Sequence, residues 1–128
     1  MRHDLLVDMF CTIKNAEAMG KAECAVPASK LIKDVLSVME RNGYIGGSEH
    51  VEDGRGGKLR VTLIRRINDT NAIKPRFFVS AREFPKYEKR FLPSVGAGIL
   101  VVSTSRGVMD QNRAREEGIG GSLLGFVY

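Results

Sequence analysis

The sequence has few residues of the kinds that cross-link a chain or bind a metal ion, and it has no long apolar run. Its two cysteines, Cys11 and Cys24, lack metal-ligand spacing and neighbouring ligands, so we predict free thiols that are buried like small hydrophobic side chains. No apolar segment approaches the ~20 residues that a membrane-spanning helix needs. Residues 1–4 lack the apolar core of a signal peptide, so we expect a cytoplasmic protein with no membrane partner.

Catalytic groups are also scarce. The chain has two histidines, His3 and His50. Both lie in the opposite half from the serine-rich segment 103–105, whose hydroxyls would need a base to act as nucleophiles. The sequence shows no paired carboxylates around an apolar segment, no Cys/His cluster and no GxGxxG or Walker pattern. We therefore predict that the protein is not an enzyme and that it holds no cofactor and no metal.

Positive charge is concentrated in the second half of the chain. The 128 residues are enough for one ordinary core or two small ones, and 43% apolar with 27% charged residues is typical of a soluble globular protein. The formal net charge is +5. Residues 1–70 carry 11 Lys and Arg against 10 Asp and Glu, whereas residues 71–128 carry 9 against 5. The second half is therefore the better candidate for binding a polyanion.

The first half begins with the pattern of two helices around a short strand. Apolar residues recur at helical spacing over residues 4–19, with Asp4 as the N-cap and Gly20 as the stop. Roughly alternating residues 21–26 predict a strand. A second amphipathic helix follows, with Ser29 as its N-cap.

A hairpin completes this half. Its predicted strands cover residues 44–51 and 59–67, and its charged, glycine-rich tip either joins the strands or lies on RNA as a basic-ended finger. The polar segment 68–71 marks a domain boundary. We therefore predict an N-terminal α-β-α-β-β domain over residues 1–70.

The second half predicts a C-terminal domain, residues 71–128, that is mostly β with short helices. Its predicted strands are 77–79, 99–102 and 123–128, and its helical segments are 83–91 and 111–117. The fold class is therefore α+β, with two small α/β domains. A protein-interaction module is an alternative function, built on the aromatic residues of this half, although such residues more often form core. They are Phe77, Phe78, Phe84 and Tyr87.

The segment from Ser103 to Asp110 is the candidate binding site. It places three adjacent hydroxyls, one guanidinium and a glycine in a predicted turn after the apolar run 99–102, which is typical of a buried strand. Hydroxyls and backbone N–H groups can donate to phosphate, ribose and base edges. Alternatively, the hydroxyls satisfy only their own turn backbone. The nearby Gly120 and Gly121 predict a close backbone approach, either by another strand or by a ligand.

Several stretches, in order along the whole chain, match one known family. They are Val26-Pro27-Ala28-Ser29-Lys30-Leu31, Asn42-Gly43-Tyr44-Ile45, Asp53-Gly54-Arg55-Gly56-Gly57, Ile73-Lys74-Pro75-Arg76-Phe77, Leu92-Pro93, Ser103-Thr104-Ser105-Arg106-Gly107-Val108-Met109 and Gly120-Gly121-Ser122-Leu123-Leu124. In them the chain resembles the universal small-subunit ribosomal protein eight family, in its archaeal and eukaryotic form. One departure is Gln111-Asn112, where this form usually has His-Glu.

The resemblance implies a cytoplasmic, ribosome-bound protein that is a primary binder of small-subunit rRNA. Such proteins grip a distorted helix of the central domain, help assemble the subunit platform and adjoin other small-subunit proteins. Some members also bind a similar hairpin in their own messenger RNA. Carried over by motif, the implied RNA-binding residues of the C-terminal domain are Ser103, Thr104, Ser105, Arg106, Gly107, Gly120, Gly121 and Ser122. Those of the N-terminal domain are Arg2, Asn15, Ser29 and Lys30.

Overall fold

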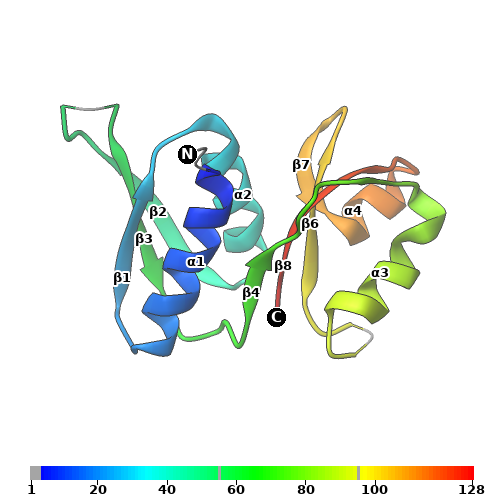
Figure 1. Ribbon diagram of the computed structural model, residues 1–128, viewed down its shortest axis with the longest axis horizontal. Coiled ribbons are helices and arrows are strands. Elements are labelled where there is room, and N and C mark those ends of the chain that lie inside the picture. Colours follow the sequence, from blue (N-terminus) through cyan, green and yellow to red (C-terminus); the bar gives the residue numbers. More distant parts are fainter. Residues whose placement is uncertain (1–3, 55, 95) are drawn as a thin grey trace.

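The computed structural model describes residues 4–54, 56–94 and 96–128, which form alternating layers of sheets and helices (Figure 1). A three-stranded sheet lies at one side, and helices α1 and α2 lie between it and a five-stranded sheet. Two shorter helices cover the far face of that second sheet. The arrangement confirms the predicted α+β class, with an α/β N-terminal half and a C-terminal half that is mostly β.

The N-terminal half comprises α1 (Leu5–Ala18), β1 (Glu23–Pro27), α2 (Lys30–Arg41), β2 (Ile45–Val51) and β3 (Lys58–Leu63). The two predicted N-caps are confirmed. Asp4 Oδ1 accepts hydrogen bonds from the N–H groups of Leu6 and Val7, at 3.0 and 3.3 Å, and Ser29 Oγ accepts one from Ile32 N–H at 3.1 Å. These side chains satisfy N–H groups that the first helical turn leaves unpaired.

The three-stranded sheet has the order β1-β3-β2 and is antiparallel throughout. In the central strand β3, Leu59, Val61 and Leu63 are buried and alternate with exposed residues, as expected for a sheet with one face in water. β3 ends at Leu63 rather than at residue 67, because residues 64–66 are exposed and leave the sheet.

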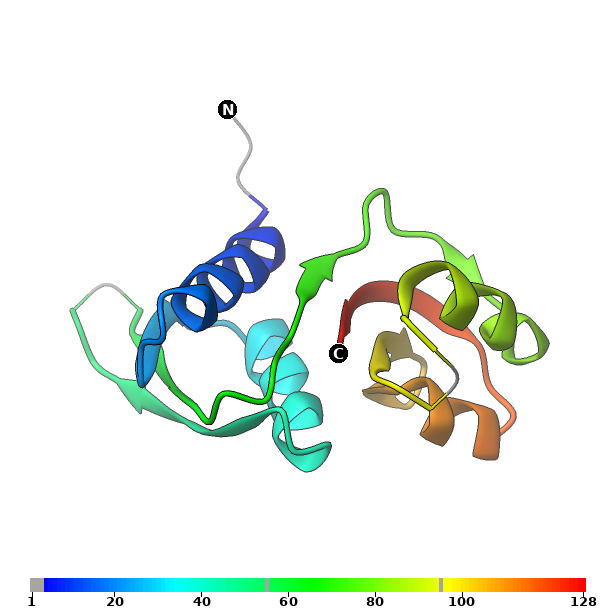
Figure 2. The same cartoon turned by 90° about the horizontal axis from the view of Figure 1, so that it is seen from below.

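The C-terminal half comprises β4 (Thr70–Ala72), β5 (Phe78–Val79), the short 3₁₀ helix Ala81–Glu83, α3 (Phe84–Phe91), β6 (Ile99–Thr104), β7 (Gly107–Asp110), α4 (Gln111–Glu116) and β8 (Gly121–Val127). Its sheet has the order β4-β8-β6-β7, and β5 also pairs with β8. Figure 2 shows β4 between the two halves of the molecule. All pairings in this sheet are antiparallel.

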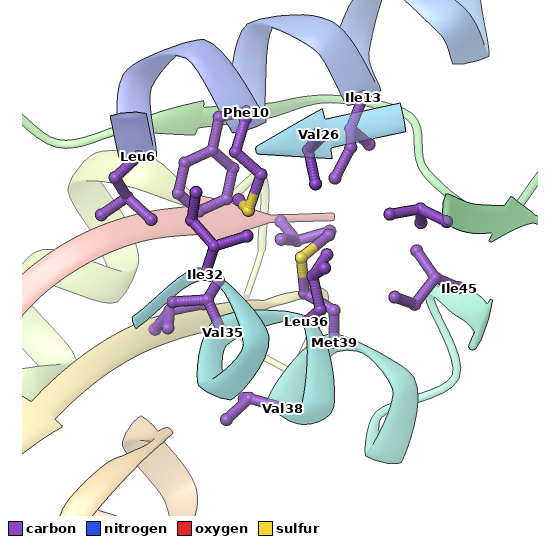
Figure 3. Close-up of a cluster of buried hydrophobic side chains, with 14 of the residues drawn as sticks. Leu6, Phe10, Ile13, Val26, Ile32, Val35, Leu36, Val38, Met39 and Ile45 are labelled. Atoms are coloured by element: carbon purple, nitrogen blue, oxygen red, sulfur yellow. The ribbon is translucent and has the colours of Figure 1, made fainter. Parts of the chain in front are cut away.

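Strand β6 is buried on both faces. Ile99 and Val101 belong to an apolar cluster with α1 and α2, whereas Leu100 and Val102 belong to a second cluster with residues of α3 and α4. This is why its apolar residues are consecutive rather than alternating. Figure 3 shows the first cluster, in which side chains of α1 and α2 point toward one another.

The first apolar cluster crosses the predicted domain boundary at residues 68–71. It combines residues of α1, α2 and the three-stranded sheet with Ile99 and Val101 of β6 and Leu124 and Val127 of β8. The domain division itself remains a prediction, but the helical layer packs on strands from both halves. The two halves therefore share one close-packed apolar contact.

Two sequence predictions require correction. Cys11 is exposed and Cys24 is half-buried, so neither is a buried thiol. Cys11 lies on the solvent side of α1, whose buried side carries Leu6, Met9, Phe10, Ile13 and Ala16. The expected turn over 103–110 is instead the end of β6, a turn and β7. Among the described residues, no helix is long and apolar enough to cross a membrane.

Candidate nucleic-acid interface

The predicted hydroxyl segment forms a tight β-hairpin. Thr104 pairs with Gly107, so the turn between β6 and β7 consists of Ser105 and Arg106. Thr104 Oγ1 donates to Gly107 O at 2.7 Å and accepts from Arg106 N–H at 3.1 Å. Gly107 has φ 110°, a conformation that favours glycine. The turn is therefore held by its own hydrogen bonds on a strand that is buried on both faces.

The three hydroxyls of this segment have different roles. Thr104 satisfies its own turn, as the alternative reading of the sequence proposed. Within the described residues, the hydroxyls of Ser103 and Ser105 have no hydrogen-bond partner, and neither is a buried unsatisfied group. Ser105 is exposed at the turn, and Ser103 is half-buried beside it. Both hydroxyls are therefore available to an external partner.

The segment Gly120-Gly121-Ser122 lies next to this hairpin as expected, but Gly121 and Ser122 begin strand β8 rather than forming a turn. Ser122 of β8 pairs with Ser103 of β6, and its hydroxyl is likewise unpartnered among the described residues. A Cβ at Gly121 would lie 2.3 Å from Ser103 O, and one at Gly120 would lie 2.3 Å from Val79 O. Contact between strands therefore accounts for both glycines, which decides the question that the sequence left open.

Arg106 carries the charge of the hairpin tip. Its guanidinium donates to Glu117 Oε1 at 3.0 Å, while Arg113 Nε donates to Glu117 Oε2 at 3.3 Å. The hydrogen bond from Arg106, together with that from Arg113, lowers the pKa of the Glu117 carboxyl below its ordinary value. The Arg106 side chain is still 63% exposed, so it can reach a phosphate while it keeps this contact.

The predicted N-terminal contacts are dispersed. Ser29 caps α2, and Lys30 is exposed in the adjoining turn. Asn15 is exposed in the last turn of α1. At a rise of about 1.5 Å per residue, Asn15 lies about 15 Å along the helix axis from the first residue of α1. The structure therefore does not bring Asn15 together with Ser29 and Lys30. Arg2 lies outside the described residues.

A groove joins the starts of α1 and α2 to the segment before β5. It has a volume of about 660 Å³, and its lining residues include Asp4, Ser29, Lys74 and Arg76. The Asp4 carboxylate lies 3.7 Å from both Lys74 Nζ and an Arg76 guanidinium nitrogen. Burial raises the pKa of Asp4, but hydrogen bonds from the Val7 and Leu6 N–H groups and these two cations outweigh burial and lower it overall.

Residues 74–78 also contribute to this side of the molecule, although they are not among the predicted site residues. Figure 1 shows the start of α1 and the tip of the β6–β7 hairpin at the same upper edge. Lys74 and Arg76 are exposed there, and Phe78 pairs with Ser122. The alternation of side chains along a strand was the signal that could have indicated an exposed Phe78. Val79 is buried, so its neighbour Phe78 must point to the opposite face.

The comparisons with known proteins agree over the whole chain. The family model described as Ribosomal protein S8 matches residues 4–128. A protein named "Small ribosomal subunit protein uS8" from Methanococcoides burtonii is 53% identical over 126 residues, covering 98% of this chain and 97% of its own. Proteins of the same name from Archaeoglobus fulgidus and Pyrobaculum neutrophilum are 52% and 51% identical, over 129 and 126 residues.

These matches cover nearly all of both chains. The Archaeoglobus fulgidus protein is aligned over 100% of each chain, and the Pyrobaculum neutrophilum protein over 98% of this chain and 97% of its own. The family model includes the described part of both sheets and of the β6–β7 hairpin. The chain therefore belongs to the ribosomal protein S8 family.

Proposed function

We propose that this protein is a primary rRNA-binding protein of the small ribosomal subunit. It binds an irregular helix of the central domain and helps to assemble the subunit platform. Membership of the ribosomal family identifies a structural constituent of the ribosome rather than an enzyme, and it places the protein with the ribosome in the cytoplasm. The specific rRNA helix, the neighbouring ribosomal proteins and a hairpin in the protein's own messenger RNA belong to the proposal.

The observation that carries the proposal is the set of unpartnered hydroxyls on a rigid sheet. Ser103 and Ser122 face each other across β6 and β8, and Ser105 projects from the adjoining two-residue turn. Folding leaves all three without a partner among the described residues. An external hydrogen-bonding ligand would satisfy them without displacing any internal bond.

RNA geometry makes such a surface suitable for an irregular helix. The major groove of A-form RNA is too narrow for side chains, so proteins contact the shallow minor groove, the 2′-hydroxyls and unstacked bases. Short hydroxyl side chains on a hairpin can reach these groups. Cations such as Arg106, Arg76 and Lys30 would contact phosphates and add affinity that weakens as salt rises.

A salt titration with two RNAs tests the proposal. One RNA contains the irregular central-domain helix of small-subunit rRNA, and the other is a regular duplex of equal length. We expect tighter binding to the irregular RNA, and we expect the difference to persist at high salt because hydrogen bonds to bases and sugars release few counterions. Equal affinities that fall together with salt would overturn the proposal, because a basic surface alone behaves in that way.

A further inference from the structure

An exposed aromatic ring lies in the same row as the unpartnered hydroxyls. Phe78 of β5 pairs with Ser122 of β8, which pairs with Ser103 of β6, which pairs with Val108 of β7. Residues that pair in an antiparallel sheet project from the same face. Neighbouring strands are about 4.8 Å apart. The Phe78 ring therefore lies one strand from the Ser122 hydroxyl and two strands from the Ser103 hydroxyl.

This row lies on the face of the sheet that turns toward α1 and α2. Val101 and Val108 pack in the apolar cluster of those helices, and Ser103 shares their face because side chains alternate along a strand. The helices do not reach Phe78, however. Phe78 is 70% exposed, and Lys74 and Arg76, which line the groove, precede it by four and two residues.

The local backbone leaves room for the ring. A Cβ at Gly120 would lie 3.2 Å from Phe78 Cζ, so the ring rests beside a residue without a side chain. Val79, the next residue, is fully buried and anchors the strand on the other face. The ring is therefore a large apolar surface in water, held by a paired strand and bordered by hydroxyls.

We propose that Phe78 stacks on an unpaired base of the bound RNA, while the Ser122 and Ser103 hydroxyls contact the edge or the sugar of that nucleotide. This inference rests on the proposed function, since it assigns the chemistry of one part of the same interface. Aromatic rings stack on splayed bases in single-stranded loops and bulges, where regular duplexes offer none. Phe78 thus distinguishes an irregular helix from a regular one.

Substitutions at Phe78 test this role. Phe78→Ala is expected to weaken binding to the irregular RNA by about 5- to 150-fold, which corresponds to the 1–3 kcal/mol that base–aromatic stacking contributes. Phe78→Tyr should retain the affinity because it keeps the ring. Phe78→Leu should lose most of it, although it keeps much of the apolar surface.

The control is Met19→Ala. Met19 is also 70% exposed but lies at the C-terminal end of α1. Its replacement should change the affinity for neither the irregular RNA nor the regular duplex.

The Phe78 variants should bind the regular duplex with the same affinity as the wild type. The dependence of log K on log salt should keep its slope in Phe78→Ala, whereas Arg76→Ala should reduce the slope by about one if that side chain meets a phosphate. Thermal unfolding of each variant verifies that folding is intact.

A second set of RNAs identifies the base. Each unpaired base of the internal loop is deleted in turn, and each RNA is bound to the wild type and to Phe78→Ala. Deletion of one particular base should weaken binding by the wild type as much as Phe78→Ala weakens binding to the intact RNA. Phe78→Ala should bind that deleted RNA no more weakly than the wild type does. Additive losses for every deletion would overturn the inference.

The outcomes separate the two proposals. If the wild type prefers the irregular RNA but Phe78→Ala or Phe78→Leu binds it equally well, the stacking role is wrong and the proposed function stands. A loss confined to binding of a neighbouring ribosomal protein would likewise assign the ring to a protein contact and overturn the inference. If the wild type shows no preference, the proposed function fails and the inference fails with it.

Discussion

The β6–β7 and β2–β3 hairpins both end in polar tips, but their strands have different surroundings. β6 is buried on both faces, and its two-residue turn is tied together by the Thr104 hydroxyl. β2 is an edge strand that is exposed from Ser48 to Val51, and it joins β3 through residues 52–57. Within the described part of that connection, Gly57 N–H donates to Asp53 Oδ1 at 2.9 Å.

This difference shows what turns a polar tip into a defined binding surface. Hydroxyls bind specifically when their positions are fixed before the ligand arrives, because the entropy of ordering the loop then does not oppose binding. The β6–β7 tip has this support from two apolar layers. The β2–β3 tip projects away from the helices (Figure 1), and the finger-like role considered for it remains a prediction.

The largest expected effect comes from removing support beneath the β6–β7 hairpin. Leu100 is fully buried in β6, so Leu100→Ala should lower the free energy of unfolding by about 2–5 kcal/mol through lost burial and a cavity. Val51→Ala in β2 is the counterpart, since Val51 is 39% exposed, and it should stay within about 0.5 kcal/mol. Denaturant unfolding measures both. Similar losses would remove the contrast between the hairpins.

Gly121→Ala tests the close contact between β8 and β6. Its Cβ would lie 2.3 Å from the backbone oxygen of Ser103, so the strands must separate, at a cost of about 1–3 kcal/mol in unfolding free energy. Gly46→Ala in β2 is the control, because its Cβ would lie 3.1 Å from side-chain methyl groups of Ile64 and Thr62, which can move. Thermal unfolding should show the smaller loss for Gly46→Ala; the opposite order would contradict this account.

Ser105→Ala isolates the hydroxyl at the turn. We expect it to weaken binding to the irregular rRNA helix by about 1–3 kcal/mol, the range for a polar group whose partner is lost at a buried contact. Ser105 is exposed in the free protein, so folding stability should not change. Ser48→Ala on the exposed part of β2 should change neither quantity. Equal RNA affinity of Ser105→Ala and the wild type would contradict the role of this hydroxyl.

The smallest effect concerns pH. The pKa of Glu117 is lowered by its hydrogen bond from Arg106 and by Arg113, so the contact stabilises the folded hairpin above the ordinary carboxyl pKa. That stabilisation is lost as pH falls through the lowered pKa. In Arg106→Ala, NMR titration should show the pKa of Glu117 moving up toward its ordinary value. An unchanged pKa would mean that Arg106 does not hold this carboxylate in solution.

Local patterns in the sequence were enough to predict most elements. Asp4 and Ser29 were recognisable as N-caps because their oxygens accept bonds from N–H groups two or three residues away. The continuous apolar run in β6 predicted a strand buried on both sides, and this is confirmed. Cys11 was misplaced, because an isolated apolar residue beside a helical stripe can lie on either side of its edge.

The candidate site was harder to predict because its parts come from distant segments. The hydroxyl segment was evident in the sequence, but its hairpin geometry depends on pairing between residues 103–104 and 107–108. The sequence allows Phe78 to be either a core residue or part of an interaction surface, and its exposure depends on where α1 and α2 stop covering the sheet. No local sequence pattern indicates where the helices stop covering the sheet.

The sequence by itself determined the helices, the buried strand, the polar hydroxyl segment and the resemblance to a ribosomal family, because each depends on short spacings or on motifs in order. Only the tertiary structure decided that β5, β8, β6 and β7 place Phe78, Ser122 and Ser103 in one row. It also decided that one apolar cluster joins both halves of the chain. The physical reason is that pairing register and packing are set by contacts between segments far apart in sequence, where a shift of one residue reverses the exposed face.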